Sequence, residues 1–226
     1  MNNRMKGFYR DKAIIRAVEQ YKCLNTEQIQ CLLFGNMKSG LRKCQQRLKR
    51  LTDRGKLKRW RYDLEEPYAY YITRLEQMEH TILLNWSIIW IKTNLKSWEE
   101  IYSFEYEVKK YPMIRPDAFV AIENKITSKF KFIYIEMDRA ESANRFDKVR
   151  KYNDLYESNK FKGEWWVKLT KRFPPIILVT TEMKRLKKIE KHIERENRNG
   201  LEFIACLVDD LRKEVLSNEI VCYNEA

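Results

Sequence analysis

Residues 38–61 read KSGLRKCQQRLKRLTDRGKLKRWR, and this basic stretch indicates the fold of the first part of the chain. It holds eleven Lys or Arg residues against a single acidic residue, Asp53. Ser39 can begin a helix, Gly55 can end it, and the residues beyond Gly55 are typical of a basic strand. Residues 1–73 hold 17 Lys and Arg against 7 Asp and Glu, so they carry +10 of the chain's net charge of +13. A charge concentrated in this way indicates a nucleic-acid partner.

The elements on either side of the basic helix complete a compact N-terminal unit. We expect helices over 11–21, 26–34 and 39–55, followed by strands over 56–62 and 68–73. Asn25 or Thr26 can cap the second helix. The inward face of the third helix is expected at Leu41, Cys44, Leu48 and Leu51. Three helices followed by a hairpin predict a winged helix-turn-helix DNA-binding domain over residues 1–73.

Within that domain, the third helix would enter the major groove and the hairpin would touch the DNA backbone or the minor groove. Long Lys and Arg side chains can reach phosphates, whereas Arg and Gln can also read base edges. The alternative is a solvated amphipathic helix, but no acidic residue occurs between positions 34 and 52. The expected DNA contacts are Lys38, Ser39, Arg42, Lys43, Gln45, Gln46, Arg47, Lys49, Arg59 and Arg61.

Residues 74–226 have a different pattern, with 28 basic against 25 acidic residues. We expect a helix over 75–95, strands over 103–107, 117–123 and 131–137, a helix over 143–158, a strand over 176–181, a helix over 182–197 and a strand over 201–208. Runs such as FIYIEM and PIILVT are apolar on both faces, as in the centre of a sheet covered by helices. The fold class predicted is α+β, with an α/β sandwich and a mixed central sheet following the N-terminal domain.

Three carboxylates punctuate the predicted sheet. Asp117 follows Pro116, and Glu136 and Asp138 lie two residues apart near the end of the next strand, so both point to one face. If the strands are neighbours, Asp117 and Glu136 can bind one Mg²⁺ or Mn²⁺ through oxygen ligands. Equally, carboxylates at strand ends are often purely structural.

This order of motifs resembles the PD-(D/E)xK nuclease superfamily, whose fold is that of the restriction endonucleases. The resemblance implies catalytic roles for Asp117, Glu136 and Asp138, with Asp117 and Glu136 as metal ligands. It departs from the pattern at position 138, where the superfamily has a lysine and this chain has Asp138. Lys148 or Lys151, on the next predicted helix, can substitute by reaching back over the sheet, which adds Lys148 to the catalytic candidates.

A narrower resemblance covers nearly the whole chain. The stretches MEHTILLNW, IRPDAFVAI, YIEMDRAES, KVRKY and VTTEMKR are similar in order and spacing to the replication-relaxation family of plasmids and other mobile elements. That resemblance implies a DNA-binding protein acting in plasmid replication or DNA relaxation, with a nuclease-like domain over residues 74–226. Replication or conjugation proteins and a second copy of the chain are then expected partners, besides double-stranded DNA.

Three functions remain open from the sequence: an accessory DNA-binding protein with a degenerate nuclease domain, an active Mg²⁺-dependent endonuclease or nickase, and a transcriptional regulator whose second domain dimerises or senses a signal. The absent E-x-K lysine favours the first and the third. The most apolar run, 81–91, is too short to span a bilayer, and no signal peptide is recognisable. Five scattered Cys residues without a CxxC spacing indicate reduced thiols. We therefore expect a cytoplasmic protein that does not bind membranes.

Overall fold

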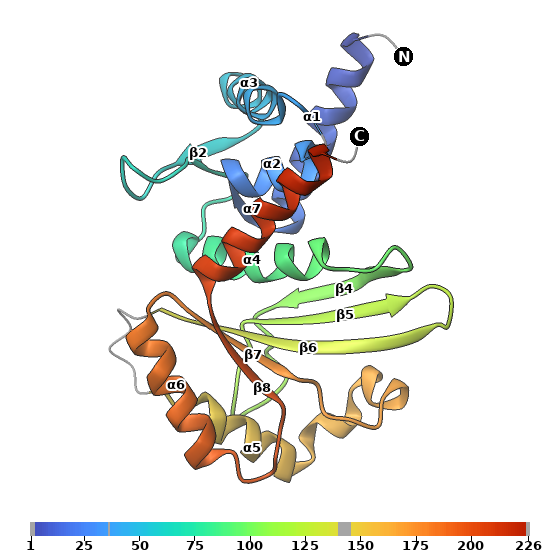
Figure 1. Ribbon diagram of the computed structural model, residues 1–226, viewed down its shortest axis with the longest axis vertical. Coiled ribbons are helices and arrows are strands. Elements are labelled where there is room, and N and C mark those ends of the chain that lie inside the picture. The colour runs from blue at the N-terminus through green and yellow to red at the C-terminus, as the bar shows by residue number, and fades with distance from the viewer. Residues whose placement is uncertain (1–2, 36, 140–145, 225–226) are drawn as a thin grey trace. The chain divides into compact units, whose positions relative to one another are not determined.

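The computed structural model describes residues 3–35, 37–139 and 146–224, shown in Figure 1. The chain divides into two compact units, one formed by residues 1–89 with 212–226 and the other by residues 90–211. The described residues form seven α-helices, two short 3-10 helices, a three-stranded sheet and a five-stranded mixed sheet. The chain is therefore an α+β protein, as predicted.

The N-terminal unit begins with three helices interrupted by one short strand. Its elements are α1 (Asn3–Gln20), β1 (Cys23–Asn25), α2 (Thr26–Phe34), α3 (Gly40–Asp53), β2 (Lys58–Trp60), β3 (Ala69–Tyr71) and α4 (Met78–Thr93), the last of which runs on beyond this unit. The sheet is antiparallel in the order β1-β3-β2. Strand β1 was not expected from the sequence, because three residues are too few to show an alternating pattern.

Local capping explains where α2 and α3 begin and end. Asn25 caps α2 in a reciprocal capping box with Gln28, as one of the two predicted caps. Ser39 occupies the cap position of α3 without a side-chain hydrogen bond. Gly55 follows α3 with φ +68°, a conformation that a residue with a Cβ rarely adopts.

The predicted inward face of α3 is correct at three of its four positions. Cys44, Leu48 and Leu51 are buried, but Leu41 is 46% exposed. Leu41 lies four residues before Gln45 and eight before Lys49, so it continues their stripe along the helix rather than the apolar one.

Helix α4 is tied to the N-terminal unit by buried polar contacts. The Asn85 side chain donates to the carbonyl oxygens of Tyr21 and Cys23, at 3.1 and 2.6 Å. Gln28, on α2, donates to the carbonyl of Ile82 at 2.8 Å. Because these groups are buried, they depend on one another for their hydrogen bonds. The N-terminal unit therefore extends to residue 89, beyond the boundary at residue 73 expected from the charge pattern.

The C-terminal unit is built on a mixed sheet. Its strands are β4 (Glu99–Tyr106), β5 (Ala118–Asn124), β6 (Lys129–Asp138), β7 (Ile176–Thr180) and β8 (Phe203–Leu207), in spatial order β4-β5-β6-β7-β8. The first three strands are antiparallel, and β6-β7 and β7-β8 pair in parallel. Helices α5 (Lys148–Ser158) and α6 (Met183–Glu196) connect the parallel strands and lie on one side of the sheet (Figure 1).

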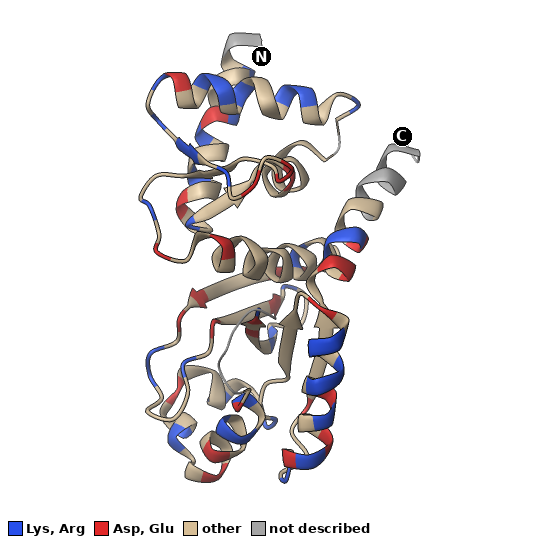
Figure 2. Ribbon diagram, turned by 90° about the vertical axis from the view of Figure 1, so that its left-hand side faces the viewer, with Lys and Arg blue, Asp and Glu red and all other residues tan. Residues whose placement is uncertain are grey.

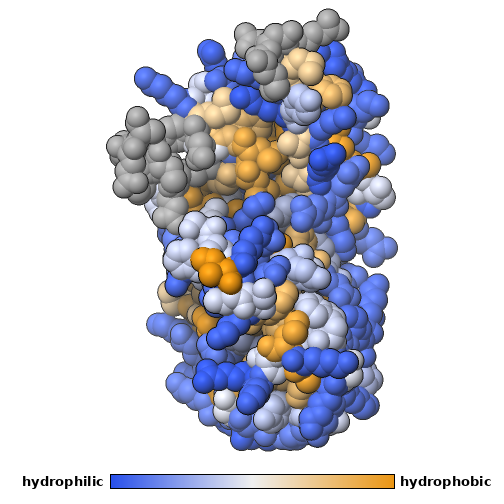
Figure 3. All heavy atoms as spheres, turned by 90° about the vertical axis from the view of Figure 1, so that its right-hand side faces the viewer, coloured by the Kyte–Doolittle hydropathy of each residue, from blue (hydrophilic) through white to orange (hydrophobic). Residues whose placement is uncertain are grey.

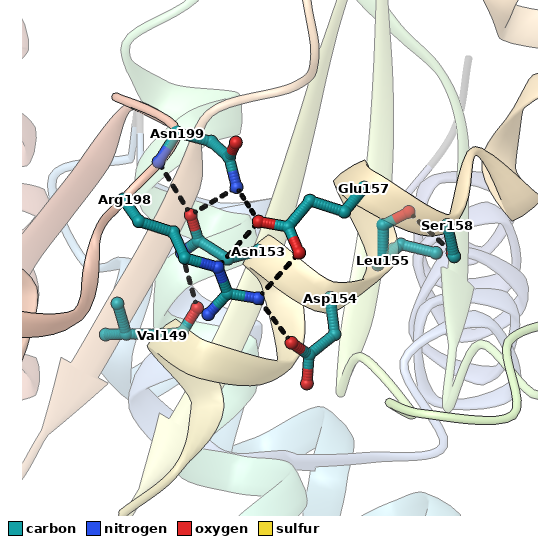
Figure 4. A network of polar contacts seen from close by, with 8 residues as sticks. All are labelled: Val149, Asn153, Asp154, Leu155, Glu157, Ser158, Arg198 and Asn199. Atoms are coloured by element: carbon teal, nitrogen blue, oxygen red, sulfur yellow. Dashed lines mark hydrogen bonds and ion pairs between the residues drawn. The ribbon is translucent and has the colours of Figure 1, made fainter.

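A polar network fastens the end of α6 to α5. Arg198, just after α6, donates to Glu157 and Asp154, and Asn199 donates to Asn153 and Glu157 (Figure 4). Several charged hydrogen bonds on one guanidinium restrain it more than a single exposed pair would. This network holds α5 in place from its C-terminal half, and the N-terminal half of the same helix carries Lys148 and Tyr152.

The last helix, α7 (Val208–Asn224), was not expected from the sequence. From Arg212 onward it belongs to the N-terminal unit, where Arg212 forms an ion pair with Glu27 at 2.7 Å. None of the helices within the described residues is both long enough and apolar enough to cross a membrane.

Candidate nucleic-acid interface and carboxylate cluster

The outer face of α3 is polar and open to solvent. Its exposed side chains include Arg42, Gln45, Gln46 and Lys49, opposite the buried Cys44 and Leu48. Within the part of the chain that the structure describes, none of these four polar side chains makes an ion pair or a hydrogen bond. Figure 2 shows Lys and Arg recurring along this helix. Their donors are therefore available to an external partner.

Arg47 faces another direction. Its guanidinium donates to both carboxylate oxygens of Asp11 on α1 and, at 2.8 Å, to the carbonyl of Gly7. A Cβ at Gly7 would lie 3.0 Å from this guanidinium, so glycine permits the close approach. Arg47 was expected to contact DNA, but the structure places it in an internal link between α1 and α3.

The two arginines expected to act from the hairpin lie beside an aromatic ring. The guanidinium groups of Arg59 and Arg61 stand 4.5 and 4.0 Å from the Tyr68 ring centroid. Together with Gln45 and Lys49, they line a groove of about 590 Å³. Of the other expected contacts, Lys38 is exposed, and Ser39 and Lys43 are half-buried. The structure thus brings α3 and the β2–β3 hairpin to one basic groove.

In the other unit, pairing of β5 with β6 brings two of the three carboxylates together. Ala118 pairs with Ile135, so Asp117 and Glu136 occupy the next positions along the two strands. Glu136 is buried, with 1% of its surface exposed. Its Oε2 accepts from Lys148 Nζ at 2.5 Å, and its Oε1 accepts from the Tyr152 hydroxyl at 2.8 Å. Asp117 Oδ2 accepts from the Met137 amide at 2.8 Å.

The third carboxylate has a separate partner. Asp138 accepts two hydrogen bonds from Arg185 on α6, at 2.5 and 3.1 Å. Lys151, the other lysine considered for the site, pairs with Asp147 at 2.9 Å. The predicted convergence therefore holds for Asp117, Glu136 and Lys148, whereas Asp138 is held by Arg185.

The electrostatics of this carboxylate cluster (Asp117, Glu136, Lys148 and Tyr152) follow from burial. Loss of hydration and the nearby Asp117 charge raise the pKa of Glu136 to about 8, against the opposing effects of Lys148 and Tyr152. Burial lowers the pKa of Lys148, but attraction to Glu136 and Asp117 outweighs it, so the net shift is upward. Burial and the Asp117 charge therefore oppose ionisation of Glu136, while Lys148 and Tyr152 favour it.

Two residues of these contacts were not assigned a role from the sequence. Tyr152 was quoted only within KVRKY, and Arg185 only within VTTEMKR. The signal for Tyr152 is its position four residues after Lys148, which places both on the same helical face. Arg185 lies 47 residues from Asp138, and no local pattern predicts such a contact.

The carboxylate oxygens of Glu136 already have protein partners where a divalent ion would bind. In the described part of the chain, no group of three or more His, Cys, Asp or Glu side chains is positioned to hold a metal. Glu136 uses one oxygen for the Lys148 ammonium and the other for the Tyr152 hydroxyl. A metal at Glu136 would lie beside the Lys148 ammonium group, which would repel it.

Comparison with known proteins leaves the chain without an assigned class. No protein-family model, no curated protein and no solved structure matches it.

Proposed function

We propose that this is a DNA-binding protein whose N-terminal unit is a winged helix-turn-helix. The observation that carries this proposal is the row of exposed side chains on α3, Arg42, Gln45, Gln46 and Lys49, which have no partner within the described residues. The order α1-β1-α2-α3-β2-β3 supports it, because a three-stranded sheet with a basic third helix suits insertion of that helix into the major groove.

The side chains divide into two kinds of contact. Arg42, Gln45 and Gln46 offer donors and acceptors that fit base edges, whereas Lys49 offers a point charge for phosphate. Arg59 and Arg61 extend the positive charge from α3 to the hairpin. In this proposal the DNA backbone follows the groove while α3 reads the bases.

For the C-terminal unit we propose a degenerate fold of the PD-(D/E)xK type that serves in DNA or protein contacts rather than cleavage. Three antiparallel strands followed by helix, strand, helix and strand support the first part. The second part rests on the partners of the carboxylates, since Glu136 and Asp138 each bind a basic side chain and Asp117 accepts a backbone amide. The role proposed is that of an accessory factor in replication or DNA relaxation of a mobile element.

The test is DNA binding by the full chain, measured by fluorescence anisotropy with a labelled duplex over a range of salt concentrations. We expect binding that falls steeply with salt, because each neutralised phosphate releases counterions. The triple variant Arg42→Ala, Gln46→Ala, Lys49→Ala should lose most of it. A matched control is Lys187→Ala with Lys188→Ala, two exposed lysines on α6. Equal loss in both variants, or no duplex binding by the parent, contradicts the proposal.

A metal-dependent endonuclease is the second candidate, favoured by one observation. Lys148 reaches Glu136 from α5 and so places a lysine beside the paired carboxylates despite the missing E-x-K. Supercoiled plasmid incubated with Mg²⁺ or Mn²⁺ tests this candidate. Nicking that disappears in both Asp117→Asn and Lys148→Ala would replace the degenerate interpretation with the enzymatic one.

A further inference from the structure

Two adjacent tryptophans in the C-terminal unit have opposite environments. Trp166 is 2% exposed and belongs to the core, whereas Trp165 is 42% exposed. The Trp165 ring lies 6.0 Å from that of Tyr102, which is 57% exposed. Figure 3 shows that, on the face it presents, hydrophobic residues gather in separate groups among hydrophilic ones. A single exposed aromatic side chain is common on a protein surface. Two large exposed rings in mutual contact are unusual, and their exposure needs a reason.

An irregularity in strand β4 directs the Tyr102 side chain toward Trp165. Ile101 pairs with Ile122 and Ser103 with Ala121, so Tyr102 is an extra residue in the ladder between β4 and β5. Such a bulge redirects a side chain, and β4 is an edge strand of its sheet. As a result the Tyr102 ring contacts Phe130 of β6 edge-on, at 5.3 Å and 89°.

The rings of Tyr102 and Trp165 pack against Phe130 and Phe132. Trp165 contacts Phe132 at 5.4 Å and Phe130 at 6.3 Å, in both cases edge to face. Phe130 and Phe132 are parallel, 5.9 Å apart, and Phe132 is buried. Tyr102 and Trp165 are therefore held in place by packing below, while their outer surfaces remain open.

Several Lys and Arg residues lie near Trp165 in the sequence. Trp165 and Lys168 lie in the same 3-10 helix, Trp165–Leu169, where residues three apart share a face. The exposed cations of segment 160–172 are Lys160, Lys162, Lys168, Lys171 and Arg172. Within the described residues none of these five side chains forms an ion pair, and the segment's one acidic residue, Glu164, is bonded to Lys110 at 3.2 Å. The segment therefore carries uncompensated positive charge beside an aromatic surface.

We propose that Tyr102 and Trp165 form a stacking site for the unpaired bases of single-stranded DNA, with the five cations of segment 160–172 contacting its phosphates. Stacking on aromatic rings combined with a basic path is the general means of binding single strands without sequence preference. The site goes beyond the proposed duplex binding, because it contains no residue of α3 or of the β2–β3 hairpin. A protein surface would not require the uncompensated lysines.

The experiment measures binding of the full chain to labelled oligo(dT), to the same strand with abasic positions and to a duplex. Trp165→Ala and Tyr102→Ala should each weaken oligo(dT) binding about tenfold and leave duplex binding unchanged. Trp165→Phe should retain most of the affinity, since it keeps an aromatic ring on Phe132. Leu169→Ala, which removes an exposed apolar side chain in the same segment, should have no effect.

The abasic strand separates stacking from charge. The parent should bind it more weakly than oligo(dT), whereas Trp165→Ala should bind both strands alike. Three results would each overturn the proposal. The parent could bind both strands with equal affinity, oligo(dT) binding could be lost only in the α3 triple variant, or the parent could fail to bind oligo(dT) at low salt. Oligo(rU) bound more tightly than oligo(dT) would overturn its assignment to DNA. Failure of duplex binding alone would contradict the proposed function and leave this site standing.

Discussion

The ammonium group of Lys148 lies 2.5 Å from Oε2 of the buried Glu136, joining the start of α5 to the end of β6. This contact places a protein cation at the one fully buried carboxyl group of the cluster. Asp117 adds a second negative charge, and Tyr152 adds a hydroxyl donor. Lys148 and Tyr152 therefore act together on this carboxyl group, against its burial and the Asp117 charge.

The first prediction concerns pH. Because burial and Asp117 raise the pKa of Glu136 to about 8, the folded chain holds this proton more tightly than the unfolded chain, where Glu titrates at about 4.3. Between these values, rising pH favours unfolding by up to about 1.4 kcal/mol per pH unit. Glu136→Gln removes this dependence, so the variant should gain stability relative to the parent from about pH 5 to about pH 8. Denaturant unfolding at several pH values measures it. Glu190→Gln, at an exposed position on α6, is the control, and parallel curves for Glu136→Gln and the parent would contradict the prediction.

The second prediction concerns metal binding. Lys148→Met removes the cation from Glu136 while keeping an unbranched side chain, so Glu136, next to Asp117, loses its ammonium partner. Such a pair favours a bound cation or a proton. We expect calorimetry with Mn²⁺ to show weak binding by the parent, tighter binding by Lys148→Met and none after adding Asp117→Asn. Equal affinity in the parent and Lys148→Met would show that the ammonium does not compete with the metal.

The third prediction separates the roles of the side chains on α3. Arg42→Ala and Gln46→Ala should each weaken binding to a preferred duplex by about 1–3 kcal/mol, more than to random DNA, if each makes a good bidentate base contact. Lys49→Ala should weaken all duplexes alike and reduce the salt slope by about one. Anisotropy titrations on selected and random duplexes measure both effects. The same loss on both duplexes for all three variants would make α3 a phosphate-binding helix only.

The fourth prediction concerns the internal link between α1 and α3. Arg47→Ala should destabilise the chain by about 1–3 kcal/mol, because a partly buried Asp11 carboxylate loses charged hydrogen bonds. Arg50→Ala, on the exposed face of the same helix, should change stability by less than about 0.5 kcal/mol. A double-mutant cycle with Asp11→Ala measures the coupling. Strictly additive effects would show that the two side chains act independently.

Elements with strong local patterns were predicted well. Cys44, Leu48 and Leu51 recur at helical spacing and are buried in α3, and the apolar runs FIYIEM and PIILVT form the central strands β6 and β7. Other elements were missed or shifted. Strand β1 is three residues long, whereas α7 was overlooked even though its buried Val208, Leu211 and Val215 lie at helical spacing. The predicted helix over 143–158 begins at Lys148 in the described part of the chain, and its residues 143–145 lie outside that part.

From the sequence alone we predicted most of the helices and strands, the concentration of charge on α3 and the positions of Asp117 and Glu136 at the ends of consecutive strands. These follow from periodicity and from the alternation of side chains along strands, which are local properties of the chain. Which partner each charged group takes depends on how the elements pack. Arg47 turns to Asp11, Asp138 to Arg185 and Lys148 to Glu136, across separations of 36, 47 and 12 residues. Tertiary packing also buries Trp166 and leaves Trp165 exposed. A buried charge needs whichever partner the packing brings within reach, and adjacent positions in the chain do not encode that distance.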